Sequence, residues 1–103
     1  MSEEQQLAEI RERIDEIDQQ IQDLLNARAR AAQEVAGIKL ASDPRAVFYR
    51  PEREAQVLRM VKARNRGPLD AETVARLFRE IMSACLALEL PLKVAFLGPE
   101  GTF

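Results

Sequence analysis

The first forty residues carry an uninterrupted helical pattern, and this pattern constrains the fold of the 103-residue chain more than any other feature. From about Glu3 to Leu40, no proline occurs and the only glycine is Gly37. Apolar residues recur mostly three or four positions apart, the period of a helix. They are Leu7, Ile10, Ile14, Ile17, Ile21, Leu24, Leu25, Val35 and Ile38. A helix of ~35 residues is ~50 Å long, whereas a compact domain of this size has a radius of gyration of ~13 Å. The helix must therefore extend beyond its own domain, and a second copy of the chain is the most economical cover for its apolar stripe.

A coiled coil is the alternative for this segment. Residues 28–33 are small or polar and interrupt a heptad seam, which favours a globular helical fold. Aromatic residues make up only 5% of the chain and tryptophan is absent. A core built from Leu, Ile, Val, Ala and Met suits helix packing better than a β-sandwich.

Two further helices complete an all-α, three-helix fold. Pro51 fits the first turn of a helix that ends before the Asn-Arg-Gly-Pro sequence at residues 65–68. Asp70 is a good N-cap for a third helix, and Pro91 is expected to stop it. The apolar stripe of this third helix comprises Val74, Leu77, Phe78, Ile81, Met82, Cys85 and Leu86.

The C-terminal tail departs from the helical pattern. Residues 93–97 form a short apolar run, and a Gly-Pro-Glu-Gly turn follows, as in a strand that enters a loop. A lone strand has no partner in a three-helix protein. We therefore expect residues 1–91 to form the helical domain, and residues 92–103 to be a linker and the truncated first strand of a following domain.

Composition excludes several function classes. The net charge is −2, so the basic excess of a general nucleic-acid binder is absent. No apolar run is long enough to span a bilayer, and the single cysteine, Cys85, suits a reducing compartment, so a cytoplasmic protein is expected. The sequence has no histidine, which removes the commonest general base and argues against a metal site.

The candidate chemistry lies in charged residues at helical spacings. Arg28 and Lys39 are eleven residues apart, so they share one helix face, ~16 Å apart along the axis. Arg11 lies ~100° around the helix from Arg28 and must face something else, such as a partner chain. Glu89 ends the apolar stripe of the third helix, and Arg53 and Glu54 form a polar pair on the second.

Each of these charges has a simpler interpretation. The cations of a long helix are usually solvated, Glu89 could lie at a rim in water, and Arg53 and Glu54 could form an exposed first turn. If the groups do converge, the pocket holds several cations and one or two carboxylates, without a nucleophile or a metal. Such a pocket suits a substrate with two carboxylates, which the protein orients while it stabilises charge that shifts in the transition state.

These residues resemble a known family. The shared strings are Leu7-x-x-Ile10-Arg11-x-x-Ile14-x-x-Ile17-Asp18, Leu24-Leu25-x-x-Arg28, Ile38-Lys39, Arg50-Pro51-Glu52-Arg53-Glu54 and the segment from Leu77 to Glu89. They resemble the all-α chorismate mutases, and most closely the mutase domains of bifunctional chorismate mutase–prephenate dehydratases. Residues 94–103 resemble the opening of the prephenate dehydratase domain.

The resemblance implies an intertwined homodimer, in which the long first helices span both subunits and the partner subunit's Arg11 enters each site. It implies the Claisen rearrangement of chorismate to prephenate in phenylalanine biosynthesis, with no cofactor. Arg28 and Arg11 would bind substrate carboxylates, and Lys39 would donate to the ether oxygen and a carboxylate. Glu54 would accept from the ring hydroxyl, and Arg53 would brace the site.

Three positions depart from the pattern of the relatives. Glu89 stands where many relatives have a Gln that donates to the ether oxygen, and a carboxylate must be protonated to do so. Cys85 stands where some have a Ser near a carboxylate, and Arg50 where some have an Asp near the hydroxyl. Two other functions remain open: a non-catalytic helical dimerisation or regulatory module, and a salicylate-forming pyruvate lyase, which fits the pocket charges but not the tail.

Overall fold

The computed structural model describes the backbone of residues 1–101 and the side chains of residues 1–95. It contains three helices, α1 (Glu3–Ser42), α2 (Pro51–Arg64) and α3 (Ala71–Gly101), and no strand within the described residues. The predicted all-α, three-helix fold with a very long first helix is confirmed.

Local signals at both ends define α1. The Ser2 hydroxyl accepts from the backbone N–H of Gln5, and the Gln5 side chain accepts from the backbone N–H of Ser2. This capping box, with acidic residues in the first turn, stabilises the N-terminus against the helix dipole. At the other end, Asp43 adopts extended backbone and its N–H donates to the carbonyl of Lys39.

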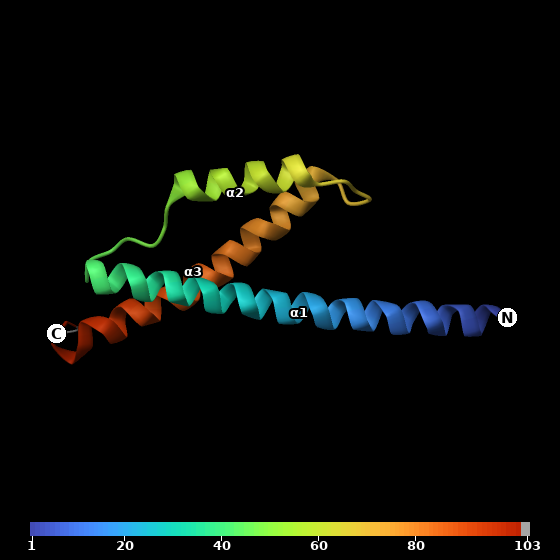
Figure 1. Ribbon diagram of the computed structural model, residues 1–103, viewed down its shortest axis with the longest axis horizontal. Coiled ribbons are helices and arrows are strands. Elements are labelled where there is room, and N and C mark those ends of the chain that lie inside the picture. The colour runs from blue at the N-terminus through green and yellow to red at the C-terminus, as the bar shows by residue number, and fades with distance from the viewer. Residues whose placement is uncertain (102–103) are drawn as a thin grey trace.

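The three helices form an open, elongated molecule. Its principal extents are 66 × 29 × 19 Å and its radius of gyration is 18.8 Å, well above the ~13 Å of a compact domain of this length. Figure 1 shows α3 crossing α1, with α2 joined to the start of α3 and the N-terminal half of α1 projecting alone. The backbone of α3 approaches both α1 and α2, whereas α1 and α2 do not approach each other within the described residues. The space between α1 and α2 is where the pocket described below lies.

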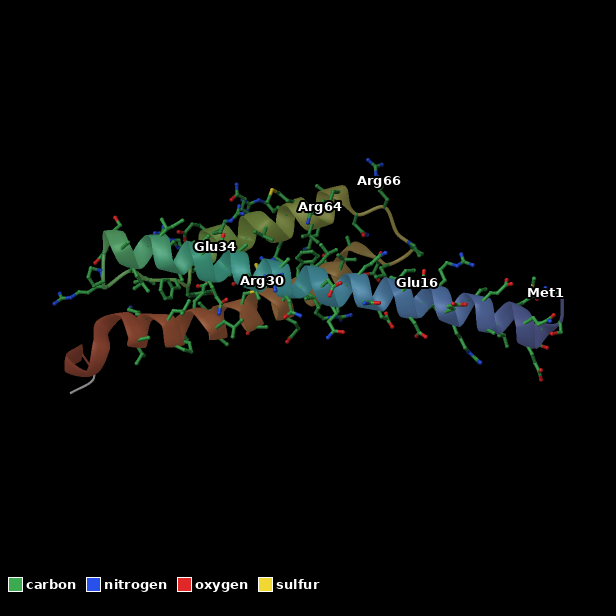
Figure 2. All side chains as sticks on the ribbon, turned by 60° about the horizontal axis from the view of Figure 1, so that its bottom comes forward. Met1, Glu16, Arg30, Glu34, Arg64 and Arg66 are labelled. Atoms are coloured by element: carbon green, nitrogen blue, oxygen red, sulfur yellow. The ribbon has the colours of Figure 1, made fainter. Side chains whose placement is uncertain are left out.

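The hydrophobic core is small and lies at the C-terminal half of α1. Ala36, Leu40 and Phe48 form a buried cluster, and Ala46, Leu86 and Leu92 pack against it. By contrast, the apolar stripe on the N-terminal half of α1 is between 40% and 69% exposed. Figure 2 shows that side chains surround this projecting half without a neighbouring element. The stripe is thus uncovered within one chain.

The connection between α2 and α3 is set by short-range hydrogen bonds. The Asn65 side chain donates to the carbonyl of Leu69 at 2.8 Å, and the Asp70 carboxylate accepts from the backbone N–H of Thr73 at 2.7 Å. Gly67 has φ 75°, a conformation that side-chain-bearing residues rarely adopt. The predicted N-cap role of Asp70 and the predicted end of α2 before residue 65 are confirmed.

The C-terminal end of α3 differs from the sequence prediction. Pro91 does not stop the helix, and residues 93–97, predicted as a strand, are helical in a segment that runs to Gly101. A lone strand would leave its N–H and C=O groups unpaired, whereas a helix pairs them within the segment, at the cost of one lost hydrogen bond at each of Pro91 and Pro99. Leu92 also packs on the core cluster, which favours continued helix. Residues 102–103 lie outside the described residues, and the domain boundary at residue 91 stays a prediction.

Candidate functional site

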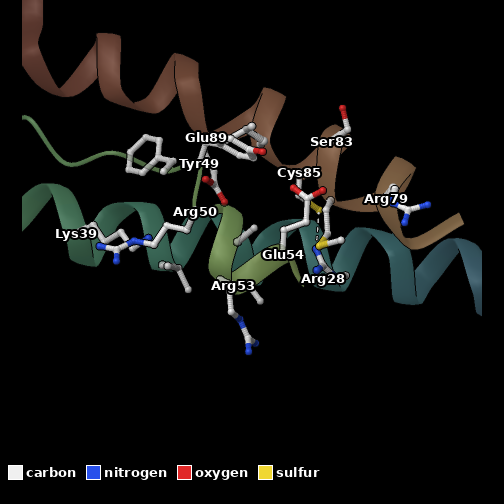
Figure 3. Close-up of a pocket in the computed structure, with 16 residues that line it drawn as sticks. Arg28, Lys39, Tyr49, Arg50, Arg53, Glu54, Arg79, Ser83, Cys85 and Glu89 are labelled. Atoms are coloured by element: carbon white, nitrogen blue, oxygen red, sulfur yellow. Dashed lines mark hydrogen bonds between the residues drawn. The ribbon is translucent and has the colours of Figure 1, made fainter. Parts of the chain in front are cut away.

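A pocket of about 590 Å³ lies between α1 and α2 and is backed by α3. Residues of α1, of the loop that precedes α2, of the first turn of α2 and of α3 contribute to its walls, as Figure 3 shows. The lining residues are Arg28, Ala31, Ala32, Val35, Lys39, Phe48, Tyr49, Arg50, Arg53, Glu54, Arg79, Met82, Ser83, Cys85, Leu86 and Glu89. Four arginines and a lysine line this space with only two carboxylates, so the pocket favours an anionic ligand.

Seven of the eight candidate residues line this one pocket. They are Arg28, Lys39, Arg50, Arg53, Glu54, Cys85 and Glu89. Arg28 and Lys39 share it as the eleven-residue spacing predicts, although three separate elements supply the other five. Arg11 is the exception, because it lies on the exposed, projecting half of α1. It is ~26 Å along the helix axis from Arg28, too far to reach the pocket of its own chain.

Arg28 is held by a long-range contact with α3. Its Nη1 donates to the sulfur of Cys85 at 3.2 Å, a pairing of residues 57 apart in the sequence. The Cys85 side chain is only 5% exposed, so its sulfur is a fixed point on α3. Sulfur is a weak acceptor, and four other N–H groups of the guanidinium remain for a ligand.

The two arginines near the start of α2 contact side chains that do not line the pocket. The Nη1 of Arg53 donates to the side-chain oxygen of Gln56 at 2.7 Å, and Figure 3 shows its guanidinium directed away from the other labelled groups. Arg50 lies 3.8 Å from the Glu52 carboxylate, and both side chains are exposed. An exposed pair of this length contributes little to stability, so Arg50 can rearrange at small cost.

Glu89 has an unusual electrostatic environment. It is half-buried on α3, and burial raises the pKa of its carboxyl, while Lys39 and then Arg28 lower it by a smaller amount. The net pKa is above the ordinary value for a glutamate. Desolvation disfavours the charged form more than the two cations favour it, so a larger fraction of Glu89 is protonated near neutral pH.

Sequence reasoning missed four polar or aromatic pocket residues. Phe48 and Tyr49 come from the loop before α2, and Arg79 and Ser83 come from α3. Two signals were available: the aromatic pair stands out in a chain with 5% aromatics, and Arg79 and Ser83 are four residues apart, so they share one helix face beside the apolar stripe. Neither signal indicates a pocket without the tertiary arrangement.

The described residues contain neither a metal-binding cluster nor a membrane-spanning helix. Within them, no group of three or more His, Cys, Asp or Glu side chains is arranged to hold a metal ion. None of the helices, over the same part of the chain, is both long and apolar enough to cross a bilayer.

Comparison with known proteins identifies the family. A family model described as chorismate mutase type II matches residues 10–90. The chain belongs to this family. The match includes every pocket residue, all of α2 and α1 from residue 10 onward, and it ends just before Pro91.

Curated relatives of this chorismate mutase domain are longer proteins. The chain is 64% identical over its full length to the bifunctional chorismate mutase/prephenate dehydratase of Stutzerimonas stutzeri and 58% identical to that of Pseudomonas aeruginosa. It spans 29% of the length of each. A relative with the same description from Aquifex aeolicus is 40% identical over 96% of the chain.

Solved structures agree with this assignment. The form II structure of chorismate mutase from Thermus thermophilus superposes with a TM-score of 0.77 at 33% identity, covering 82% of this chain and 93% of that one. The form I structure gives a TM-score of 0.74 at 31% identity, covering 78% and 98%. The chain is therefore a helical chorismate mutase domain in sequence and in fold.

Proposed function

We propose that this chain converts chorismate to prephenate, and that the pocket between α1 and α2 is the active site. The observation that carries the proposal is the convergence of Arg28, Lys39, Glu54 and Glu89 on one 590 Å³ space from three different helices. The reaction is a unimolecular rearrangement, so the protein has to orient the substrate and stabilise charge rather than supply a nucleophile. A pocket rich in cations and without histidine suits that task.

The cations of α1 bind and polarise the substrate. Arg28 takes a carboxylate with its free N–H groups, since a planar guanidinium matches carboxylate geometry. Lys39, three turns along the same face, donates to the ether oxygen, where negative charge grows as the C–O bond breaks, and to a carboxylate. The Cys85 sulfur already fixes one end of Arg28 before substrate arrives.

The carboxylates act at two other points of the substrate. Glu54, half-buried in the first turn of α2, accepts a hydrogen bond from the ring hydroxyl. Glu89, in its protonated form, donates a second hydrogen bond to the ether oxygen. Its raised pKa supports this role, because an ionised carboxylate there would repel the developing charge. Arg53 and Arg50, near the start of α2, would brace the substrate after leaving their present partners.

The active unit is proposed to be a homodimer in which the partner subunit's Arg11 completes each site. The uncovered apolar stripe on α1 supports this, because a stripe of that length requires cover. Charge supports it too: residues 3–23 hold eight acidic and two basic residues, and residues 45–79 hold nine basic and four acidic ones. The projecting half of one copy would thus meet an oppositely charged region of the other.

The remaining proposals concern the parent protein. Residues 1–91 would form the mutase domain, and residues 92–103 a linker and the beginning of a prephenate dehydratase domain, as the bifunctional relatives and the tail sequence suggest. The parent would then catalyse two successive steps towards phenylalanine. A cytoplasmic location is proposed on the basis of the free thiol of Cys85.

The direct test is spectrophotometric loss of chorismate with identification of the product. Prephenate supports the proposal, and pyruvate would instead indicate a lyase. No turnover by a folded dimer would favour a non-catalytic module. For Arg11, mixing inactive Arg11→Ala and Arg28→Ala proteins should restore part of the activity, since a hybrid dimer has one intact site. No recovery after demonstrated subunit exchange would exclude the shared arginine.

A further inference from the structure

One wall of the pocket lacks regular secondary structure. After α1 ends, Ala46 and Arg45 donate backbone N–H groups to Asp43, and the next such bonds go to the carbonyl of Arg50 in the first turn of α2. Between them, no hydrogen bond among the described residues involves the backbone of residues 47–49. This stretch nevertheless places Phe48, Tyr49 and Arg50 on the pocket. Something other than backbone pairing must fix its position.

Phe48 is the anchor of this wall. It is 9% exposed, whereas its neighbours Val47 and Tyr49 are 65% and 54% exposed. Its ring belongs to the buried cluster with Ala36 and Leu40 and also faces the pocket. The location of the wall therefore depends on how firmly that ring is held.

Two residues near the end of α3 contact this anchor or the cluster that contains it. Leu92 packs against the cluster that contains Phe48, and the Lys93 ammonium lies 6.0 Å from the centroid of the Phe48 ring. A lysine at this distance over an aromatic face makes a cation–π contact. Both residues follow Pro91 and lie outside residues 10–90, the part that matches the family model.

We infer that Leu92 and Lys93 are positioning residues of the active site, which hold Phe48 and through it the wall that carries Tyr49 and Arg50. The inference rests on the proposed function for its kinetic consequence. It assigns residues 92 and 93 to the working mutase unit, although the sequence alone places them in a linker. A wall that is not held must be ordered when substrate binds, and that cost falls equally on the bound substrate and the transition state. Loss of the contacts that hold the wall should therefore raise KM and leave kcat nearly unchanged.

Four variants of the full chain test the inference. Leu92→Ala should raise KM by roughly three- to tenfold, and Lys93→Gln by roughly two- to fivefold, with kcat within about twofold of the parent in both. Lys93→Arg should restore the parental KM, because a guanidinium also stacks over an aromatic ring. Val94→Ala is the matched control, since its side chain is 55% exposed and belongs to no cluster.

A second measurement does not depend on catalysis. Tyr49 is the only tyrosine and the chain has no tryptophan, so intrinsic fluorescence reports on this wall alone. The fluorescence anisotropy of Tyr49 should fall in Leu92→Ala and Lys93→Gln and stay at the parental value in Val94→Ala, with helicity unchanged by circular dichroism. Unchanged anisotropy and KM in the two folded variants, or equal changes in the control, would overturn the inference. A parent that does not turn over chorismate would refute the proposed function, and the anisotropy would still decide whether Leu92 and Lys93 hold the wall.

Discussion

Replacing Glu89 with Gln should abolish a preference of the mutase reaction for acidic pH. Burial raises the pKa of Glu89, and Lys39 and Arg28 offset only part of that rise. The ether oxygen of the substrate becomes negative in the transition state, so a carboxylic acid stabilises it and a carboxylate repels it. If Glu89 is the proposed donor to this oxygen, only its protonated form is productive.

The size of the effect follows from the titration of one group. On the alkaline side of its pKa, the protonated fraction of a carboxyl falls about tenfold for each pH unit, so log kcat/KM of the parent should approach a slope of about −1 there. Bound substrate brings two further carboxylates near Glu89, which raises its pKa again. The decline in kcat should thus begin at a higher pH than the decline in kcat/KM. A glutamine donates at every pH, so the variant should give a flat profile.

The assay is chorismate loss from about pH 5 to 8.5 for the parent and for Glu89→Gln, with circular dichroism to exclude unfolding. Glu34→Gln, which changes an exposed glutamate of α1, is the control and should keep the parental profile. The pH dependence of thermal stability is a second measurement of the Glu89 pKa shift. Because folding raises the pKa of Glu89, its contribution to stability is present below the unfolded pKa and is lost as pH rises through the folded one. The melting temperature of Glu89→Gln relative to the parent should therefore increase with pH. A flat parental rate profile, or the same acidic preference in the variant, would refute the donor role.

Three other predictions follow from the same structure. Arg28→Ala and Lys39→Ala should each lower kcat/KM by about 10²–10³-fold, the cost of one electrostatic donor. Arg30→Ala, which removes an exposed arginine between them, should not, and equal loss in all three variants would contradict a specific pocket role. Light scattering should give twice the 11.7 kDa chain mass, and Ile17→Asp, which places a charge in the apolar stripe, should halve it and abolish activity. Cys85→Ala should raise KM roughly three- to tenfold by freeing Arg28, and Cys85→Ser should restore most of the affinity; equal defects would show that side-chain volume matters rather than the acceptor.

Helical periodicity predicted the parts of this molecule that depend on a single element. Three helices, the length of α1 and the shared face of Arg28 and Lys39 all follow from spacing along one helix. The convergence of Glu54 and Glu89 on the same pocket does not, because it depends on how α2 and α3 pack. For those residues the family resemblance supplied what local patterns could not.

Contacts between distant residues were outside the reach of local patterns. The bond from Arg28 to Cys85 joins α1 to α3, and the contact of Lys93 with the Phe48 ring joins the end of α3 to the loop before α2. Nothing in the spacing of these residues indicates their proximity. In the tail, a local pattern was present but ambiguous, because the short apolar run at residues 93–97 fits either a helix or a strand by periodicity alone. The proline before it suggested an ending that the structure does not have.

The openness of the single chain bears on how catalysis and stability are linked. Only six side chains are buried and apolar within the described part of the chain, and the longest apolar stripe is left uncovered. A core of that size contributes little stability relative to the entropy of ordering 103 residues, so the proposed partner subunit would supply much of the free energy of folding. The same contact would deliver Arg11 to the pocket, whose walls already hold four arginines and a lysine. The anionic substrate would neutralise part of this positive charge. Substrate that binds between cations of both chains would thus add to the stability of the dimer by mass action.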